Sequence, residues 1–150
     1  HLDPNARGVF FGLSSMHKKK DMLRAVMEGV SYSLRDCVEV MREMKINVSD
    51  MMACGGGGTS KLWRQMLADL YACPVKTTEN KEGPALGAAL LAAVGAGIYK
   101  SVPEACSVVI KPEKVQEPIH ENIGEYERVY QMYRRLYPAM KKSFEQLAQL

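Results

Sequence analysis

Four consecutive glycines, Gly55–Gly58, interrupt the stretch MMACGGGGTSKLWRQMLADLYA at residues 51–72. An apolar run precedes the glycines and an amphipathic run follows them, which predicts a turn from a buried strand into a helix. Without side chains at such a turn, a flat or phosphorylated ligand can lie against the backbone, and the helix N-terminus offers free N–H groups to an anion. The alternative is a tight strand-to-helix turn that binds no ligand.

Two well-known glycine motifs do not fit this stretch. A P-loop requires G-x-x-x-x-G-K-[ST], whereas Gly55 is followed five residues later by Ser60, and not by a second glycine before Lys61. A dinucleotide-binding fingerprint would also require glycine at position 60. The glycines alone therefore favour a ligand-binding turn at a strand end without identifying the ligand.

The rest of the pattern predicts an α/β protein. Apolar runs at 8–13, 48–55 and 74–79 predict three strands. Helical periodicity is found at about 18–45, after the glycines, at 83–100, from Ser101 to about Val109, and at about 124–149. Alternating strands and helices predict parallel, right-handed crossovers. Three strands make a small sheet for so many helices, so we expect the sheet to be incomplete.

Several faces of these helices are expected to be buried. The small-residue helix 83–100 should pack closely against neighbours, and 110–122 should be an extended linker. We expect Asn47 to end the first long helix and Pro138 to kink the last one. The expected core stripes are Leu23, Val26, Val30, Leu34, Cys37 and Met41 in the first long helix, Leu62, Met66, Leu67 and Leu70 after the glycines, and Tyr126, Tyr130, Tyr133, Tyr137, Met140, Phe144 and Leu147 in the last.

Composition narrows the functional classes. The 150 residues are 47% hydrophobic and 25% charged, which is typical of one soluble globular domain or part of one. Twenty basic and 17 acidic residues are interspersed, so nucleic acid is not an expected partner. The sequence has no apolar run of about 18 residues, so no membrane span is expected. It also lacks an initiator Met, and we expect it to be a piece of a longer protein.

Cysteine and histidine usage favours neither a metal site nor disulfides. The four cysteines, at 37, 54, 73 and 106, form no C-x-x-C pair and lie in apolar or helical contexts. This favours reduced thiols in a cytoplasmic protein, with Cys54 as a small buried hydrophobe. The histidines at 1, 17 and 120 lack the spacing of metal ligands, so no metal is predicted.

The stretch CGGGGTSKLWRQMLADLYACPV, followed by EGPALGAALLAAVGAGIY, resembles the C-terminal domain of the FGGY carbohydrate kinases, most closely the xylulose kinase branch. DPNARGVFFGLSSMHKKKDMLRAVMEGVSYSLRD fits the same domain further upstream. The resemblance implies that residues 1–150 are part of this ATP-side domain, with an actin-like ATPase, ribonuclease-H-like fold. The domain's first strands would then lie outside this sequence.

The resemblance also implies a site. Members of the family transfer the γ-phosphoryl group of ATP, with Mg²⁺, to a sugar hydroxyl, and their glycine turn receives the adenosine part of ATP. Carried over, Gly56 and Gly57 would lie against the nucleotide, Ser60 would face the adenine or ribose, and Gly55 and Gly58 would shape the turn. The family's catalytic aspartate belongs to the N-terminal domain, so we assign no catalytic residue and expect these residues alone to be inactive.

The expected function is therefore the nucleotide-binding part of an ATP-dependent sugar kinase. Its full-length parent would convert D-xylulose to D-xylulose 5-phosphate in the cytoplasm. One alternative is a kinase for glycerol or another polyol or ketose of the same family. Another is a non-catalytic binding or scaffold module that retains the fold. Exposed apolar positions in 8–13 add the hypothesis of a homodimer through an exposed sheet edge or helices.

Overall fold

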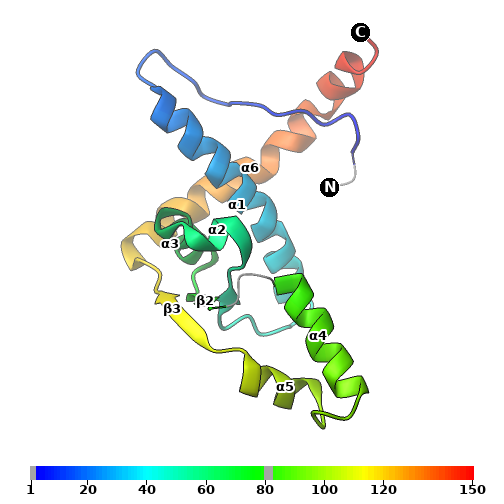
Figure 1. The fold of residues 1–150 in the computed structure, drawn as a ribbon. Coiled ribbons are helices and arrows are strands. Elements are labelled where there is room, and N and C mark those ends of the chain that lie inside the picture. The colour runs from blue at the N-terminus through cyan, green and yellow to red at the C-terminus, as the bar shows by residue number, and fades with distance from the viewer. Residues whose placement is uncertain (1–2, 80–82) are drawn as a thin grey trace.

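A computed structural model describes residues 3–79 and 83–150 of the chain (Figure 1). The helices and strands confirm an α/β protein with a small three-stranded sheet (Figure 1). In chain order the elements are α1 (Lys19–Glu43), β1 (Met51–Met52), α2 (Gly55–Thr59), α3 (Lys61–Tyr71), β2 (Val75–Thr78), α4 (Gly83–Gly95), α5 (Val102–Val109), β3 (Pro112–Gln116) and α6 (His120–Leu147).

The sheet is mixed rather than parallel. β1 pairs in parallel with β2, with Met51 opposite Val75, whereas β2 pairs antiparallel with β3, with Lys76 opposite Val115. The strand order is β1-β2-β3. β1 and β2 confirm two of the predicted strands in shorter form, but the third strand comes from a different part of the chain.

The prediction of an extended linker at 110–122 was wrong for its middle part, which is the edge strand β3, and for its last three residues, which begin α6. Pro112 opens this strand, a position where proline's lack of an N–H is tolerated. Charged residues such as Glu113 and Lys114 suit an exposed edge but obscure the alternation expected of a strand. The composition of this segment is therefore typical of a linker, although its backbone pairs with β2.

The predicted strand at 8–13 was also wrong. These residues are extended but not paired, and Val9, Phe10, Phe11 and Leu13 are exposed. A strand requires a neighbouring backbone for its N–H and C=O groups. Among the described residues, this segment is not part of the sheet.

α1 confirms the predicted helix but packs with the opposite face. The stripe expected in the core is exposed, with Leu23 at 58% and Leu34 at 50% of full exposure. α3 and α6 instead cover the side that carries Ser31, Tyr32, Arg35 and Val38, all of which are buried. The helix ends at Glu43, close to the predicted boundary at about Lys45, where a left-handed φ of 60° turns the chain before Asn47. The rest of the exposed stripe is Val26, Val30, Cys37 and Met41.

The core lies where α1, α3 and α6 meet. Tyr32 stands near the centre, with its ring centroid 6.1 Å from that of Tyr130 and 5.4 Å from that of Tyr133. This confirms that the aromatic stripe of α6 is packing surface, although Leu147 at its end is exposed. On α3, Met66 and Leu70 are buried and Leu67 is partly buried, but Leu62 is exposed. The buried cluster is Tyr32, Val38, Leu70, Tyr71, Cys73, Tyr126 and Tyr130.

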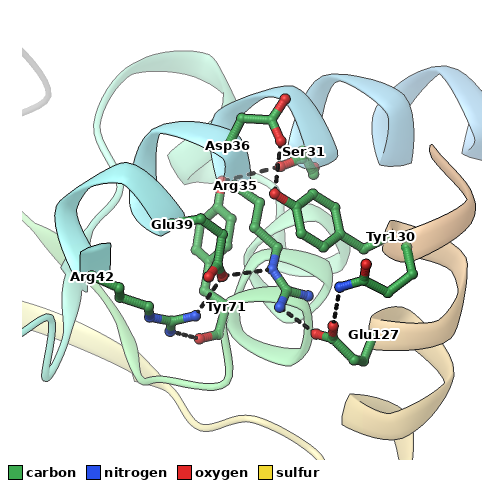
Figure 2. A network of polar contacts seen from close by, with 9 residues as sticks. Ser31, Arg35, Asp36, Glu39, Arg42, Tyr71, Glu127 and Tyr130 are labelled. Carbon is green, nitrogen blue, oxygen red and sulfur yellow. Dashed lines mark hydrogen bonds and ion pairs between the residues drawn. The ribbon is translucent and has the colours of Figure 1, made fainter. Parts of the chain in front are cut away.

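A polar network crosses the same interface. Figure 2 shows Arg35 of α1 reaching Glu127 of α6, while its Nε bonds to Glu39 at 3.1 Å. The Arg35 guanidinium also lies 4.2 Å from the ring centroid of Tyr130, whose hydroxyl donates to Asp36 at 2.7 Å. Because Arg35 is 7% exposed, these partners compensate for removing its charge from water.

α4 and α5 extend away from the sheet as an arm (Figure 1). Burial of the small-residue helix was predicted, but of the described residues in α4, Leu90 alone is buried, since α5 is the helix that packs against it. The helix also ends at Gly95, short of the predicted boundary. The start of α5 follows the prediction, with Ser101 Oγ accepting from the Glu104 N–H at 3.3 Å.

Within residues 3–79 and 83–150, no helix is long and apolar enough to cross a lipid bilayer.

Candidate functional site at the glycine turn

The glycines themselves fold into a short helix directly after β1. The Ala53 N–H still bonds to the Lys76 carbonyl at 2.8 Å, and α2 begins two residues later at Gly55. Gly55 has a φ of +69°, a left-handed conformation that residues with a Cβ rarely adopt. The chain thus reverses at the carboxyl end of a strand, where open α/β sheets place their ligands.

Gly58 is held by a close backbone approach. A Cβ at this position would lie 2.6 Å from the Ala53 carbonyl oxygen, well inside van der Waals contact. From the other side, Arg64 of α3 donates through Nη1 to the Gly58 carbonyl. Gly58 and Arg64 are both buried, so this end of α2 is fixed to both β1 and α3.

Gly56 and Gly57 leave the backbone clear. A Cβ at Gly56 would meet nothing within 4 Å, and one at Gly57 would meet the Trp63 ring at 3.5 Å, an ordinary contact. Thr59 Oγ1 donates to the Gly56 carbonyl at 2.7 Å. The turn's conformation therefore requires glycine at neither Gly56 nor Gly57, and Gly56, like Gly55, is open on the side where a Cβ would stand.

Ser60 is the N-cap of α3. Its Oγ accepts from the Trp63 N–H at 3.3 Å, and its own N–H donates to the Gly57 carbonyl at 3.3 Å. A hydroxyl that accepts one bond still has an O–H to donate. Ser60 is therefore fixed beside Gly57 and carries a donor suited to a ribose or adenine acceptor.

The start of α4 also approaches this turn. A Cβ at Gly83 would lie 3.2 Å from both Cβ and Sγ of Cys54, the residue that precedes the glycines. Cys54 is exposed, so the expectation of a buried hydrophobe was wrong. The residue lies directly before the glycines at the surface and not in the core. The four cysteines have free thiols.

The carboxylate of Asp69, near the C-terminal end of α3, has a structural role. It is 2% exposed and accepts bonds from the Ile119 N–H and Asn122 Nδ2, both at 2.7 Å. Asp69 thereby ties α3 to the start of α6. Among the described residues, which exclude His1, no group of three or more His, Cys, Asp or Glu side chains could hold a metal ion. The described part of the chain therefore offers no protein-built Mg²⁺ site.

Two hollows lie elsewhere on the described surface. One of about 430 Å³ lies between 8–13 and α1, and one of about 770 Å³ lies between the N-terminal segment, α1 and α6. The residues that line them do not include the glycine turn. The smaller hollow is lined mainly by apolar residues of 8–13 and α1. The larger one also carries charged side chains, among them Glu28, Asp36 and Arg134.

Sequence reasoning did not assign roles to Trp63 and Arg64, which contact Gly57 and Gly58 of the turn. The signal was present, because they lie three and four positions after the N-cap Ser60 and Trp63 is the single tryptophan of the chain. Residues three and four positions after an N-cap point back toward the preceding turn. Their contacts with Gly57 and Gly58 depend on how α2 folds, which the spacing does not reveal.

Comparison with known proteins shows the family to which the chain belongs. The model of the FGGY family of carbohydrate kinases, C-terminal domain, matches residues 1–96. A xylulose kinase of Staphylococcus epidermidis is 39% identical over 142 residues, which make up 95% of this chain and 29% of that protein. The chain thus spans less than a third of the length of this relative.

Solved structures show the same arrangement of elements. A ligand-bound xylulose kinase from Lactobacillus acidophilus superposes with a TM-score of 0.87 at 28% identity, covering 97% of this chain and 29% of that one. A gluconate kinase from the same organism gives a TM-score of 0.86 at 29% identity, with 97% and 29% coverage. Two proteins that are named for different sugar substrates thus share this part of the fold equally well.

Proposed function

Because the chain belongs to the FGGY family of carbohydrate kinases, we propose that Gly55–Gly58 and Ser60 bind the adenosine part of ATP. Its α/β fold is that of the actin-like, ribonuclease-H-like ATPases. One observation carries the proposal: the main chain at Gly56 and Gly57 is clear at the carboxyl end of β1, with the Ser60 hydroxyl beside it. A flat nucleoside can lie against such a backbone without meeting a side chain.

Each residue then has a separate task. Gly55 and Gly58 set the turn through a left-handed φ and a close approach to Ala53. Gly56 and Gly57 provide the surface, and the Ser60 hydroxyl orients the ribose or adenine by donating a hydrogen bond. Positioning of this kind supplies a large share of phosphoryl-transfer catalysis.

The reaction also requires groups that we do not assign to these residues. Mg²⁺, when bound, neutralises charge on the transferred phosphoryl group. A catalytic base accepts the proton of the attacking sugar hydroxyl. None of the chain's aspartates is proposed as that base, and Asp69 in particular is buried and occupied by α6. We place the base and the sugar site in the remainder of the full-length protein.

For the full-length protein we propose phosphorylation of D-xylulose to D-xylulose 5-phosphate in the cytoplasm. Support comes from the relatives named xylulose kinase, and from free thiols that suit a reducing compartment. The gluconate kinase structure makes gluconate the first competing substrate to test. ATP-dependent turnover by the full-length protein with xylulose, gluconate and glycerol, compared by kcat/KM, distinguishes them. A higher kcat/KM for gluconate or glycerol would overturn the choice of xylulose.

Nucleotide binding by this chain is tested by calorimetric titration with ADP and ATP. Gly56→Val places a side chain in the open space above the turn, where nothing lies within 4 Å, so the fold should be retained. Gly124→Val is the matched control, because Gly124 is an exposed position of α6 that also has nothing within 4 Å. Circular dichroism verifies that all three proteins are folded.

We expect saturable binding by the parent and the Gly124→Val protein, and loss of binding in Gly56→Val. Equal binding by Gly56→Val and the parent would place the nucleotide elsewhere. A folded parent that binds neither nucleotide would contradict the proposal that this turn is a nucleotide site within these residues.

A further inference from the structure

Trp63 contacts two of the residues proposed to face the nucleotide, Gly57 and Ser60. Its ring lies 3.5 Å from where a Gly57 Cβ would stand, and its N–H donates to Ser60 Oγ at 3.3 Å. Its indole Nε1 in turn donates to Ser31 Oγ of α1 at 2.9 Å. We propose that Trp63, anchored by Ser31, is a positioning residue that fixes Gly57 and Ser60 for nucleotide binding, an inference that rests on the proposed function.

The anchor is well defined. Ser31 is fully buried, and its hydroxyl donates to the Met27 carbonyl at 2.8 Å. With its hydrogen engaged there, the oxygen presents its lone pairs to the Trp63 Nε1–H. A buried serine with both roles assigned holds the indole in one orientation, because another orientation leaves a buried polar group unsatisfied.

α1 is itself fixed relative to α3. At the far end of α3, Arg42 Nη2 donates to the Tyr71 carbonyl at 2.6 Å, and the Tyr71 hydroxyl lies 3.5 Å from the Ser31 carbonyl oxygen. Hydrogen bonds from α1 therefore reach both ends of α3, through Ser31 to Trp63 and through Arg42 to Tyr71. Trp63 thereby connects α1 to the glycine turn, where the Cβ side of Gly56 has no contact within 4 Å.

The alternative is that Trp63 only fills space at the helix interface. Two features argue against it: the indole is partly exposed rather than buried, and its ring lies against a glycine whose backbone is open. An indole that served packing alone would keep its role without the Ser31 bond. Removing that bond therefore distinguishes a positioning role of Trp63 from a role in packing alone.

The test is Ser31→Ala, which removes the acceptor of the indole bond and leaves Trp63 in place. The control is Tyr130→Phe, which removes the α6 to α1 bond at Asp36, away from the turn. Three measurements are made on each protein: urea unfolding, the ADP dissociation constant by calorimetry, and amide NMR shifts of Gly55–Ser60 without nucleotide. Acrylamide quenching of the single tryptophan adds a direct probe of the ring.

We expect Ser31→Ala to weaken ADP binding about three- to ten-fold, the range for losing one hydrogen bond. It should also shift the Gly57 signal, through the altered ring current of Trp63, and increase quenching. Tyr130→Phe should lower stability but leave the turn signals and ADP affinity unchanged. Rescue by Ser31→Thr, which restores a hydroxyl, would support the bond as the cause.

The two proposals fail in different ways. If the parent binds ADP and Ser31→Ala matches it in affinity, Gly57 shift and quenching, the positioning inference is overturned and the nucleotide site stands. If the parent does not bind ADP, the proposed function fails, while the nucleotide-free NMR shifts and quenching still decide whether Ser31 and Trp63 set the turn.

Discussion

At the scale of single residues, the four glycines divide into two pairs with different requirements. Gly55 and Gly58 are required by geometry, one for its positive φ and the other for its approach to the Ala53 carbonyl. Gly56 and Gly57 meet neither constraint, so their lack of side chains calls for another reason, and the nucleotide that we propose to bind here would supply it. The sequence predicts that the glycines matter, but it cannot separate the pairs, since φ and backbone approach depend on the fold.

The first prediction concerns Gly58. Gly58→Ala should lower the free energy of unfolding by about 1–3 kcal/mol, because its Cβ would force backbone atoms apart. The matched Gly56→Ala change should be neutral or stabilising by up to about 1 kcal/mol, since it adds a methyl to open helical backbone. Urea unfolding followed by circular dichroism measures both. Equal stabilities of the two variants would refute the close approach at Gly58.

At the scale of elements, the α1 helix shows what a hydrophobic pattern can and cannot predict. The periodicity of Leu23, Val26 and Val30 correctly identifies a helix and a shared face. Which face is covered depends on partners, and α3 and α6 cover the side with Tyr32 and Arg35. In the sequence that side looks polar, because it carries an arginine and a serine. It can be buried because partners far away in the sequence, such as Glu127 and Trp63, bond to these side chains.

The second prediction tests this polar face. Arg35→Ala should cost about 2 kcal/mol of unfolding free energy, because it removes a nearly buried guanidinium with its two ion pairs and its contact with Tyr130. Glu127→Gln should cost less than about 1 kcal/mol, since the Glu127 side chain is 45% exposed. Thermal unfolding measures both, and a larger loss for Glu127→Gln than for Arg35→Ala would contradict the arrangement in Figure 2.

The third prediction concerns pH and the same helix interface. Burial raises the pKa of Tyr32, Tyr71 and Tyr130 above the usual range for tyrosine. The folded state therefore favours the neutral phenols. Their contribution to stability is fully present below about pH 10, where the unfolded chain begins to ionise, and is lost as the pH rises further.

Urea unfolding at about pH 8 and pH 11 measures this loss. Tyr32→Phe should reduce it, whereas Tyr99→Phe, between α4 and α5 and outside the core cluster, should behave like the parent. If Tyr32→Phe loses as much stability at high pH as the parent, the buried phenols are not its source.

At the scale of the whole molecule, the class of fold could be predicted, but the sheet could not be predicted in full. β1 and β2 follow from the apolar runs at 48–55 and 74–79, and the turn after β1 follows from the glycines. β3 was missed because a charged edge strand resembles a linker, and 8–13 was overpredicted because an apolar pattern does not supply a partner strand. Pairing is a property of two segments, and a pattern in one of them does not determine it.

The fourth prediction follows from the apolar surface that 8–13 and the outer face of α1 leave exposed. We expect the chain to self-associate with increasing concentration, because contact between copies removes this surface from water. Leu23→Glu combined with Leu34→Glu, both at exposed positions, should weaken the association without unfolding the chain. Light scattering over a concentration series tests it, and a monomer at every concentration would refute the homodimer hypothesis.

The central claim is that the nucleotide lies against the glycine turn. The most direct measurement is an amide NMR titration of the chain with ADP. The account predicts that the signals of Gly56, Gly57 and Ser60 move together and saturate, with smaller changes at Trp63 and little change in the hollows beside α1. Saturating shifts confined to those hollows, or no shift at the glycines of a folded chain, would contradict it.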